Sequence, residues 1–261
     1  RTAVVSLLTV VRTAKNEASV LIQRLCPRNV GGHYRQTVIL ALLVLSASIA
    51  VPILFRPFYY IQIDALRLPE RTGWPEEVIR EAYDEVLDFC VLGTPFGTGE
   101  LSWSESGRSH FADVRVLFRA DFLVLGVTAV SAALLLLLRR LHRLEFYRPV
   151  GRGPGFWAGV LAAGLVLAVG ALAALDFSRA FTVFHAVFFP GKDNWLFNPA
   201  TDEIILIMPE RFFLNCALLI GAVLLSACGA LIARLLFIAA VSQIKGIIIK
   251  LIINHYLPAK L

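Results

Sequence analysis

The stretch Phe212–Ile232 reads FFLNCALLIGAVLLSACGALI and contains no Asp, Glu, Lys or Arg. About 20 apolar residues are enough for a helix to cross the hydrocarbon core of a bilayer. Three further runs share this property: Thr37–Phe55, Phe122–Leu138 and Gly155–Leu175. Because lipid offers no partner to backbone N–H and C=O groups, each run is expected to be a helix. The sequence therefore predicts an all-α integral membrane protein with four transmembrane helices.

The composition fits this class of protein. Of the 261 residues, 57% are hydrophobic and only 17% are charged, whereas soluble domains have about 45–50% apolar and about 25% charged residues. These values exclude both a soluble globular domain and a disordered chain. Because none of the four runs contains a charged residue, an ion pump or a coupled transporter is not expected either.

The charged residues are distributed unevenly between the segments that connect the runs. Residues 1–36, 139–154 and 233–261 together hold 15 basic and 2 acidic residues, whereas residues 56–121 and 176–211 hold 10 basic and 17 acidic residues. Lys and Arg collect on the cytoplasmic side of membrane proteins, so we expect both termini in the cytoplasm and the two long loops outside. The same bias accounts for the net charge of +6. No nucleic-acid partner is expected, because no basic stripe is interleaved with aromatic residues.

This topology divides the chain into three regions. Residues 1–36 form a cytoplasmic or interfacial segment, residues 37–232 form the transmembrane domain, and residues 233–261 form a basic cytoplasmic or interfacial tail. The loops 56–121 and 176–211 are expected to build an extracytoplasmic cap on the transmembrane domain.

Two elements of the cap are visible in the sequence. Residues 74–90, WPEEVIREAYDEVLDFC, carry apolar side chains at helical spacing and predict an amphipathic helix with Pro75 at its first position. Ile204–Met208 is an apolar run too short to span a membrane, and it fits either a strand or a segment that dips into the bilayer. Cys90 is the only cysteine clearly in these loops, so no structural disulfide is expected.

Aromatic residues are concentrated in the same two loops, which hold 17 of the 28 in the chain. An interfacial belt accounts for aromatic residues at a membrane surface, but a belt occurs on both faces and the cytoplasmic segments here contain few. The asymmetry indicates an apolar chamber beneath the cap, suited to an acyl chain or a lipid-like group.

Two of the five histidines stand out by position. His110 precedes the second run and His185 follows the third, each by about ten residues, so both can lie at the same depth just above the lipid. Imidazoles titrate near neutral pH and are the usual groups for proton transfer in catalysis. We therefore interpret His110 and His185 as a candidate catalytic pair.

Other interpretations of these residues stay open. Either histidine could be a satisfied polar residue in a packed cap. His110, Asp113 and His185 could form a metal site of two histidines and one carboxylate, although the His110-x-x-Asp113 spacing fits a histidine and its orienting carboxylate equally well. We expect no bound metal. No GxSxG elbow, Walker loop, HExxH motif or dinucleotide fingerprint occurs, and no cofactor is expected.

The outer loops resemble a bacterial family of four-span membrane proteins that includes the lipoprotein intramolecular transacylase. The stretch Ser109–Arg115, SHFADVR, resembles the His-x-x-Asp-Val-basic motif of that family. A longer second motif is similar over Phe184–Phe189 (FHAVFF), Asp193–Leu196 (DNWL), Asn198–Pro199, Thr201–Asp202 and Met208–Glu210. The resemblance covers about residues 35–235.

The resemblance implies a reaction at the extracytoplasmic face of the bacterial cytoplasmic membrane. The substrate would be a lipoprotein whose N-terminal cysteine carries a diacylglyceryl thioether. Its sn-2 acyl chain would move from the glycerol oxygen to the α-amine of the cysteine, which gives a lyso-form lipoprotein. Because donor and acceptor belong to one molecule, no cofactor is required. We expect the protein to be a monomer.

The resemblance also suggests roles for individual residues. His185 would be the general base and His110 its acid or orienting partner, although the two roles could be reversed, and Asp113 would hold an imidazole in one tautomer. The expected supporting or substrate-binding residues are Asp113, Arg115, Tyr59, Tyr60, Trp195 and Asp202, of which the tyrosines and Trp195 would serve as walls or hydrogen-bond donors.

Two alternative functions belong to other classes. The chain could be a non-catalytic membrane protein whose cap binds lipid and whose histidines only pack. It could also be a metal-dependent membrane hydrolase. The distance between the two histidine rings separates a joint catalytic role from a packing role, because groups more than about 10 Å apart cannot exchange a proton directly or through one water.

Overall fold

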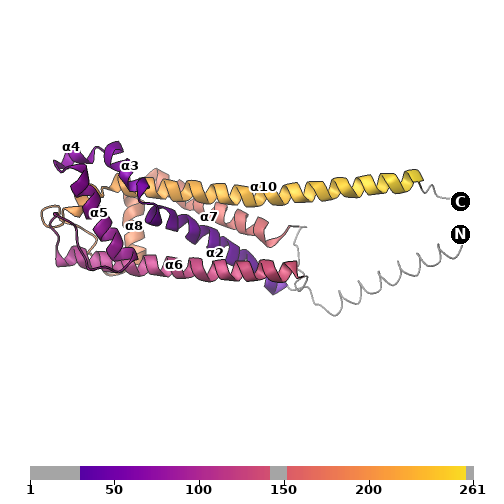
Figure 1. Ribbon diagram of the computed structural model, residues 1–261, viewed down its shortest axis with the longest axis horizontal. Helices are drawn as coiled ribbons and strands as arrows, with labels where there is room; N and C mark the ends of the chain where they lie inside the picture. Colours follow the sequence, from indigo (N-terminus) through magenta and orange to yellow (C-terminus); the bar gives the residue numbers. More distant parts are fainter. Residues whose placement is uncertain (1–29, 142–151, 257–261) are drawn as a thin grey trace.

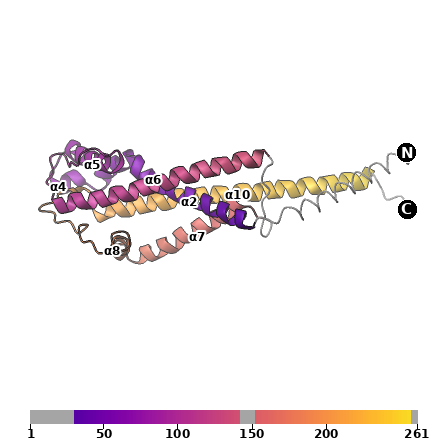
Figure 2. The same ribbon diagram turned by 90° about the horizontal axis from the view of Figure 1, so that it is seen from below.

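The computed structural model describes residues 30–141 and 152–256, and all regular structure in these ranges is helical. Four long helices run side by side along the long axis (Figure 1, Figure 2): α2 (Val30–Leu54), α6 (Glu105–Arg140), α7 (Pro154–Leu175) and α10 (Glu210–Tyr256). Each contains a segment long and apolar enough to cross a membrane. The predicted all-α fold with four spans is confirmed.

Shorter helices gather at one end of the bundle. They are α3 (Pro57–Ala65), α4 (Leu68–Thr72), α5 (Glu76–Val91), α8 (Phe177–Phe188) and α9 (Ile204–Ile207). Together with their connecting loops we call them the cap. Figure 1 shows that α8 lies across the bundle axis, directly after α7.

Helix α6 is much longer than the run Phe122–Leu138 from which it was predicted. It has 36 residues, which correspond to about 54 Å, whereas the hydrocarbon core is about 30 Å thick. The charged residues Asp113, Arg115 and Arg119 all lie in its first half. The spanning segment is therefore the second half, and residues 105–121 extend the same helix into the cap.

The spanning helices pack through small residues. Helix α2 contacts α6, α7 and α10, and α7 also contacts α10. A Cβ atom at Gly159 of α7 would lie 3.2 Å from the carbonyl oxygen of Cys228 and 3.1 Å from Cγ1 of Ile232, both on α10. Small side chains allow membrane helices to approach closely, because lipid supplies no hydrophobic force between them.

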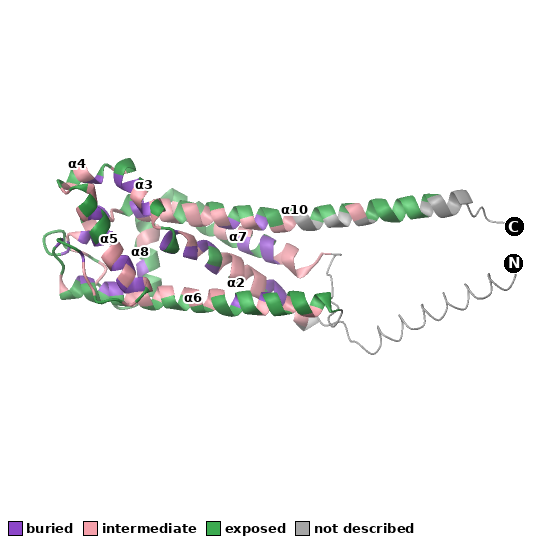
Figure 3. Ribbon diagram, in the orientation of Figure 1, coloured by how far each residue is buried: buried purple, intermediate pink, exposed green. Residues whose placement is uncertain are grey.

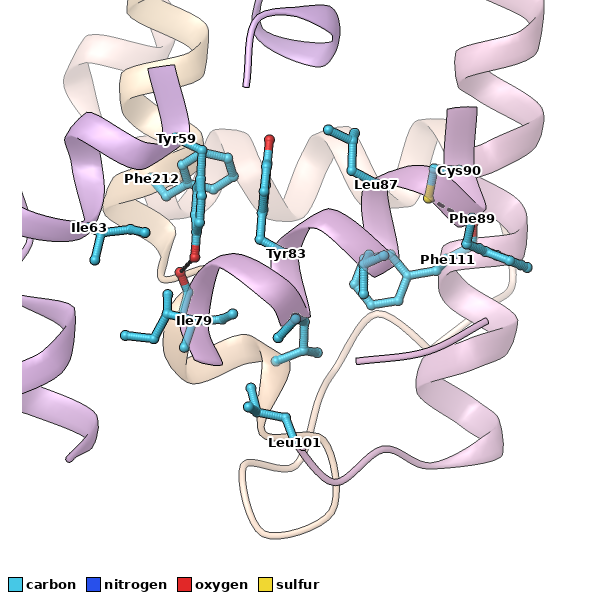
Figure 4. Close-up of a cluster of buried hydrophobic side chains, with 14 of the residues drawn as sticks. Tyr59, Ile63, Ile79, Tyr83, Leu87, Phe89, Cys90, Leu101, Phe111 and Phe212 are labelled. Carbon is cyan, nitrogen blue, oxygen red and sulfur yellow. Dashed lines mark hydrogen bonds between the residues drawn. The ribbon is translucent and has the colours of Figure 1, made fainter. Parts of the chain in front are cut away.

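The larger of the two clusters of buried hydrophobic residues lies in the cap, and a smaller one lies between the spans; Figure 3 shows buried residues in both regions. Figure 4 shows the centre of the cluster in the cap, where Tyr59 of α3 stacks on Tyr83 of α5 at a ring-centroid distance of 3.6 Å. Phe212, at the start of α10, meets both rings edge to face. This distribution has a simple reason: lipid surrounds the spans, but a domain outside the bilayer must bury its apolar side chains against one another.

Charged groups fix α3 to α5 at the edge of this core. Arg56 forms ion pairs with Asp84, at 2.9 Å, and with Asp88. The hydroxyl of Tyr60 donates to Asp84 at 2.8 Å. The predicted amphipathic helix 74–90 corresponds to α5, but Pro75 is the residue before the helix, because its ψ of 157° is extended.

Two further predicted segments are helical in the structure. Ile204–Met208 contains no strand: Ile204–Ile207 form one helical turn, whose Ile204 and Ile207 side chains are buried in the cap core. The basic tail 233–261 begins as a continuation of α10, which runs without a break to Tyr256. The predicted segment 1–36 lies almost entirely outside the described residues.

Candidate active site

His110 is held in place by the start of α6. Ser104 precedes the helix, and its Oγ atom accepts a hydrogen bond from the backbone N–H of Gly107 at 3.0 Å. Asp202, from the loop before α9, accepts from both N–H and Oγ of Ser104, at 2.9 and 2.8 Å. An N-terminal cap of this kind satisfies backbone donors that the helix itself leaves free. These bonds join the second loop of the cap to α6 just before His110.

His185 is positioned by α8. The carboxylate of Asp176 accepts from the N–H of Arg179 at 2.9 Å and thereby begins this helix immediately after α7. Nδ1 of His185 then lies 2.7 Å from the carbonyl oxygen of Phe181, one turn earlier. A carbonyl oxygen can only accept, so Nδ1 carries the proton and Nε2 carries the lone pair in the neutral ring.

The structure brings the two histidines together from distant parts of the chain. Their ring centroids are 5.8 Å apart with an interplanar angle of 32°, and each residue is only 5% exposed. The separation is well below the distance at which a shared proton-transfer role would be excluded.

Aromatic rings surround the pair. Trp195 stacks on His185 at 4.4 Å, and Phe181 lies 4.3 Å from it. Phe189 and Phe197 meet His110 edge to face, at 5.0 and 5.4 Å. The aromatic residues that the sequence placed around a chamber therefore include several that pack directly on the imidazoles.

Burial makes both imidazoles weak bases. Desolvation, with the neighbouring His185, lowers the pKa of His110 to about 4, although Asp113 and Asn194 act in the opposite direction. Desolvation also lowers the pKa of His185, against the hydrogen bond to Phe181, which favours the charged form. Both rings are therefore neutral at neutral pH, and each offers one N–H donor and one lone pair.

A polar network lies beside His110. Asp113 accepts hydrogen bonds from Nζ of Lys192 and, at 3.0 Å, from Nδ2 of Asn194. Burial opposes ionisation of Asp113, but the bonds from Lys192 and Asn194 outweigh it and hold the pKa of Asp113 below its usual value. Nδ1 of His110 and Oδ1 of Asn194 are both buried, and neither atom has a hydrogen-bond partner within the described ranges.

The expectation that Asp113 holds an imidazole tautomer is therefore wrong for His185, where the carbonyl of Phe181 does so. Asp113 acts on His110 through its charge. No group of three or more His, Cys, Asp or Glu side chains within residues 30–141 and 152–256 is arranged to hold a metal ion. The alternative metal site of His110, Asp113 and His185 is thus not assembled.

The remaining predicted supporting residues lie in different places. Trp195 contacts His185, as described above. The hydroxyl of Tyr59 donates to the carbonyl of Ile207 at 2.9 Å, and that of Tyr60 donates to Asp84, so both are already used within the cap. Asp202 caps α6. Arg115 lies over the ring of Phe89, 5.1 Å from its centroid, and not in the polar network beside His110.

Two polar residues close to the histidines were missing from the predicted set, namely Lys192 and Asn194. Both lie in the loop that follows α8, and Asn194 belongs to the DNWL stretch that carried the family resemblance. Their proximity to Asp113 depends on how this loop folds back over α6, which residue spacing does not reveal.

An apolar groove of about 270 Å³ lies further down the bundle. It is lined by aliphatic side chains of α2, α7 and α10: Val38, Ala41, Leu42, Leu45, Leu161, Ala162, Leu165, Val166, Val169 and Leu224. The groove lies within the spanning segments, whereas the chamber expected from the sequence was aromatic and beneath the cap.

These features define a four-span, all-helical membrane protein with a buried histidine pair under a cap. The family model for the lipoprotein intramolecular transacylase Lit matches residues 35–213, which include both histidines, and the chain belongs to this family. It is thus a multi-pass bacterial membrane protein. Among curated proteins, none matches the chain.

Solved structures of a family member share the fold. The membrane-integral lipoprotein intramolecular transacylase Lit from Bacillus cereus is 21% identical, with a TM-score of 0.70 over 82% of this chain and 99% of that chain. Its histidine-to-arginine variant is 20% identical, with a TM-score of 0.66 over 88% and 99%. Its histidine-to-alanine variant is 21% identical, with a TM-score of 0.65 over 80% and 92%.

Proposed function

We propose that this protein transfers the sn-2 acyl chain of a diacylglyceryl lipoprotein to the α-amine of its N-terminal cysteine. The observation that carries the proposal is the buried pair His110 and His185, with ring centroids 5.8 Å apart, in a chain that belongs to a lipoprotein transacylase family. The product would be an N-acylated, lyso-form lipoprotein.

The reaction balances without a cofactor or water. The amine nitrogen attacks the ester carbonyl carbon, and a C–N bond forms as the carbonyl oxygen becomes an oxyanion. The C–O bond to the glyceryl oxygen then breaks. One proton leaves the amine nitrogen and one proton arrives at the glyceryl oxygen, so the two histidines need only move a proton between two sites of one substrate.

His185 is the proposed general base. Its hydrogen bond to Phe181 directs the Nε2 lone pair away from α8, and its lowered pKa keeps the ring neutral at neutral pH. A positioned base contributes about 10²–10⁴-fold to the rate of such a step. The buried ring therefore accepts the amine proton during attack without first having to lose one to solvent.

His110 and its neighbours are proposed to protonate the leaving glyceryl oxygen and to stabilise the amine and the oxyanion. The neutral ring of His110 can donate its N–H to the leaving glyceryl oxygen and accept a proton from His185. The buried Oδ1 atom of Asn194, which has no partner among the described residues, can accept the second N–H of the amine. Lys192, held by Asp113, is the cation available to the oxyanion, where a fixed positive group stabilises charge.

The membrane itself is proposed to supply orientation. A lipid-modified substrate reaches the histidines along the bilayer plane, and the aliphatic groove between α2 and α7 can take one of its chains. Holding the amine and the ester within about 3–3.5 Å of each other lowers the activation barrier, because the reacting groups are already oriented when the substrate is bound. By the distribution of charged residues, we place the cap and this site on the extracytoplasmic side.

The proposal is tested by mass spectrometry of lipoprotein N-terminal peptides from cells with and without the gene. Cells that carry the gene should contain the N-acyl, lyso-form peptide, and cells without it should not. His110→Ala and His185→Ala should each abolish this product while the protein is still inserted. His33→Ala is a matched control, since His33 lies near the start of α2, at the opposite end of the bundle.

The outcomes separate the alternatives. An unchanged acyl pattern on removal of the gene would overturn the transacylase function. If both alanine variants lost thermal stability and the lyso-form product persisted, the histidines would be packing residues in the cap. If product formation required a metal that chelators remove, the metal-independent mechanism would be wrong.

A further inference from the structure

Two arginines of α6 meet at one glycine at the base of the cap. A Cβ atom on Gly93, just after α5, would lie 2.6 Å from Nη2 of Arg115 and 3.2 Å from Nη2 of Arg119. The φ of Gly93 is +86°, which also favours glycine at this position. Any side chain here would push the two guanidinium groups aside, so the absence of one creates the space in which they converge.

The two positive charges have no negative partner within the described part of the chain. None of its ion pairs involves Arg115 or Arg119. The guanidinium group of Arg115 lies over the face of Phe89, 5.1 Å from the ring centroid. The Nε atom of Arg115 is buried and has no hydrogen-bond partner among these residues. Arg115 is half-buried and Arg119 is exposed, and an anion placed between them would relieve their repulsion and accept from the unsatisfied donor.

Their position along α6 indicates the kind of anion. Arg119 lies three residues before Phe122, where the uncharged run begins, so the pair is about 5–10 Å along the helix from the hydrocarbon. This is the depth of lipid phosphates. Below Arg119, at helical spacing, α6 presents a stripe of side chains that are more than half exposed: Leu123, Val127, Val130, Leu134 and Leu137.

We propose that Arg115, Arg119 and the Gly93 turn bind the phosphate of a membrane phospholipid, whose acyl chains lie along the exposed stripe of α6. Planar guanidinium groups match the geometry of phosphate oxygens and bind them in a bidentate manner. The apolar stripe directly beneath the charges selects a phosphate attached to acyl chains over a free ion. Leu92, exposed beside Gly93, adds apolar contact at the same level.

This site is separate from the histidine pair. Arg115 follows His110 by five residues, which places it about 140° around the helix. Arg115 contacts Phe89 and the Gly93 turn, whereas His110 contacts His185, Phe189 and Phe197. Phospholipid binding is therefore independent of the proposed acyl transfer and can be tested without an activity assay.

The test is native mass spectrometry of the purified full-length chain with added phosphatidylglycerol. Diacylglycerol with the same acyl chains lacks the phosphate, so its weaker binding measures the contribution of the phosphate. Glycerol phosphate lacks the acyl chains, so its weaker binding measures the contribution of the chains. The variants are Arg115→Gln, Arg119→Gln and the double substitution. Arg108→Gln is the matched control, because Arg108 lies on the same helix but already pairs with Glu105.

We expect one phosphatidylglycerol bound to the wild type and to Arg108→Gln, at least tenfold weaker binding in the double variant, and weak binding of diacylglycerol. Arg119→Lys keeps the charge but loses the fork of donors, and should give intermediate binding. Melting temperatures in the same detergent show that each variant is folded.

Three results would overturn the proposal. They are unchanged phosphatidylglycerol binding in a folded double variant, diacylglycerol binding as tight as phosphatidylglycerol, or glycerol phosphate binding as tight as the intact lipid. The last result would show a site for a free anion and not for a membrane lipid.

Discussion

Nδ1 of His185 donates a 2.7 Å hydrogen bond to the carbonyl oxygen of Phe181, one turn earlier in the same helix. This bond fixes the tautomer of a catalytic candidate without the carboxylate that commonly does so in histidine sites. A carboxylate would stabilise the imidazolium and raise the pKa of the ring, whereas a carbonyl bond in a buried site leaves that pKa lowered. His185 is therefore unprotonated at neutral pH and available as a base.

The pH dependence of acyl transfer should show this arrangement. The substrate α-amine has a pKa of about 8, and only its neutral form attacks, so log(kcat/KM) should fall with unit slope as the pH drops below about 8. Because the base form of His185 is lost only below its lowered pKa, a second unit of slope should begin below pH 6.5. Initial rates on a synthetic diacylglyceryl peptide in mixed micelles measure both limbs.

The variant His185→Gln provides the comparison. Its rate should fall by at least about 10²–10⁴-fold, and any residual rate should depend on pH only through the amine of the substrate. If the second limb persisted in this variant with the same break, the titrating group would not be His185, and the assignment of the base would fail.

Thermal stability should fall in acid because of His110. Its pKa is lowered from 6.5 in the unfolded chain to about 4 in the folded protein, so between these values the unfolded chain binds the extra proton. The contribution of His110 to the free energy of unfolding is therefore fully present above pH 6.5 and decreases as the pH falls towards 4. The total change is about 3 kcal/mol. Melting temperatures in detergent between pH 7.5 and about 4 measure this loss.

His110→Gln removes the titrating ring but keeps a neutral polar side chain. The loss of stability between pH 6.5 and 4 should be smaller in this variant than in the wild type. Parallel curves for wild type and His110→Gln would show that burial does not hold His110 neutral.

The spans could be predicted because their signal is local. Each is a run of apolar residues, and the absence of charge within the run is sufficient evidence for a membrane helix. The upper half of α6 was not predicted, since its start depends on the bonds between Ser104 and Asp202. Those residues are distant in sequence, and residue spacing carries no information about contacts of this range.

The candidate site was predictable only in part for the same reason. His110 and His185 could be placed at one membrane depth because each lies close to a span. The hydroxyl groups of Tyr59 and Tyr60 are instead used by Ile207 and Asp84 in the cap core. Tertiary packing decides whether a tyrosine in a predicted loop faces the site or the hydrophobic core, and the sequence alone does not define that packing.

Asp202 should stabilise the protein and position His110 at the same time. Asp202→Ala removes the acceptor for the N–H and Oγ of Ser104, and we expect a loss of about 1–3 kcal/mol in the free energy of unfolding. Acyl transfer should also fall, because α6 is no longer fixed just before His110. Asp193→Ala is the control, since Asp193 is exposed and its side chain makes no hydrogen bond in the described ranges. Equal stability and activity of the two variants would rule out this role.

Gly159 should be essential for the packing of α7 on α10. In Gly159→Val the new side chain meets the carbonyl oxygen of Cys228, at 3.2 Å already from Cβ, and backbone cannot move aside as a flexible side chain can. Overpacking of this kind costs about 1–3 kcal/mol, so the melting temperature in detergent should fall by roughly 2–10 °C. Gly164→Val places the same residue on the same helix where nothing lies within 4 Å of Cβ, and its melting temperature should stay close to that of the wild type. Equal melting temperatures for the two variants would show that α7 can separate from α10 at no cost, and the close approach of these helices would then contribute nothing to stability.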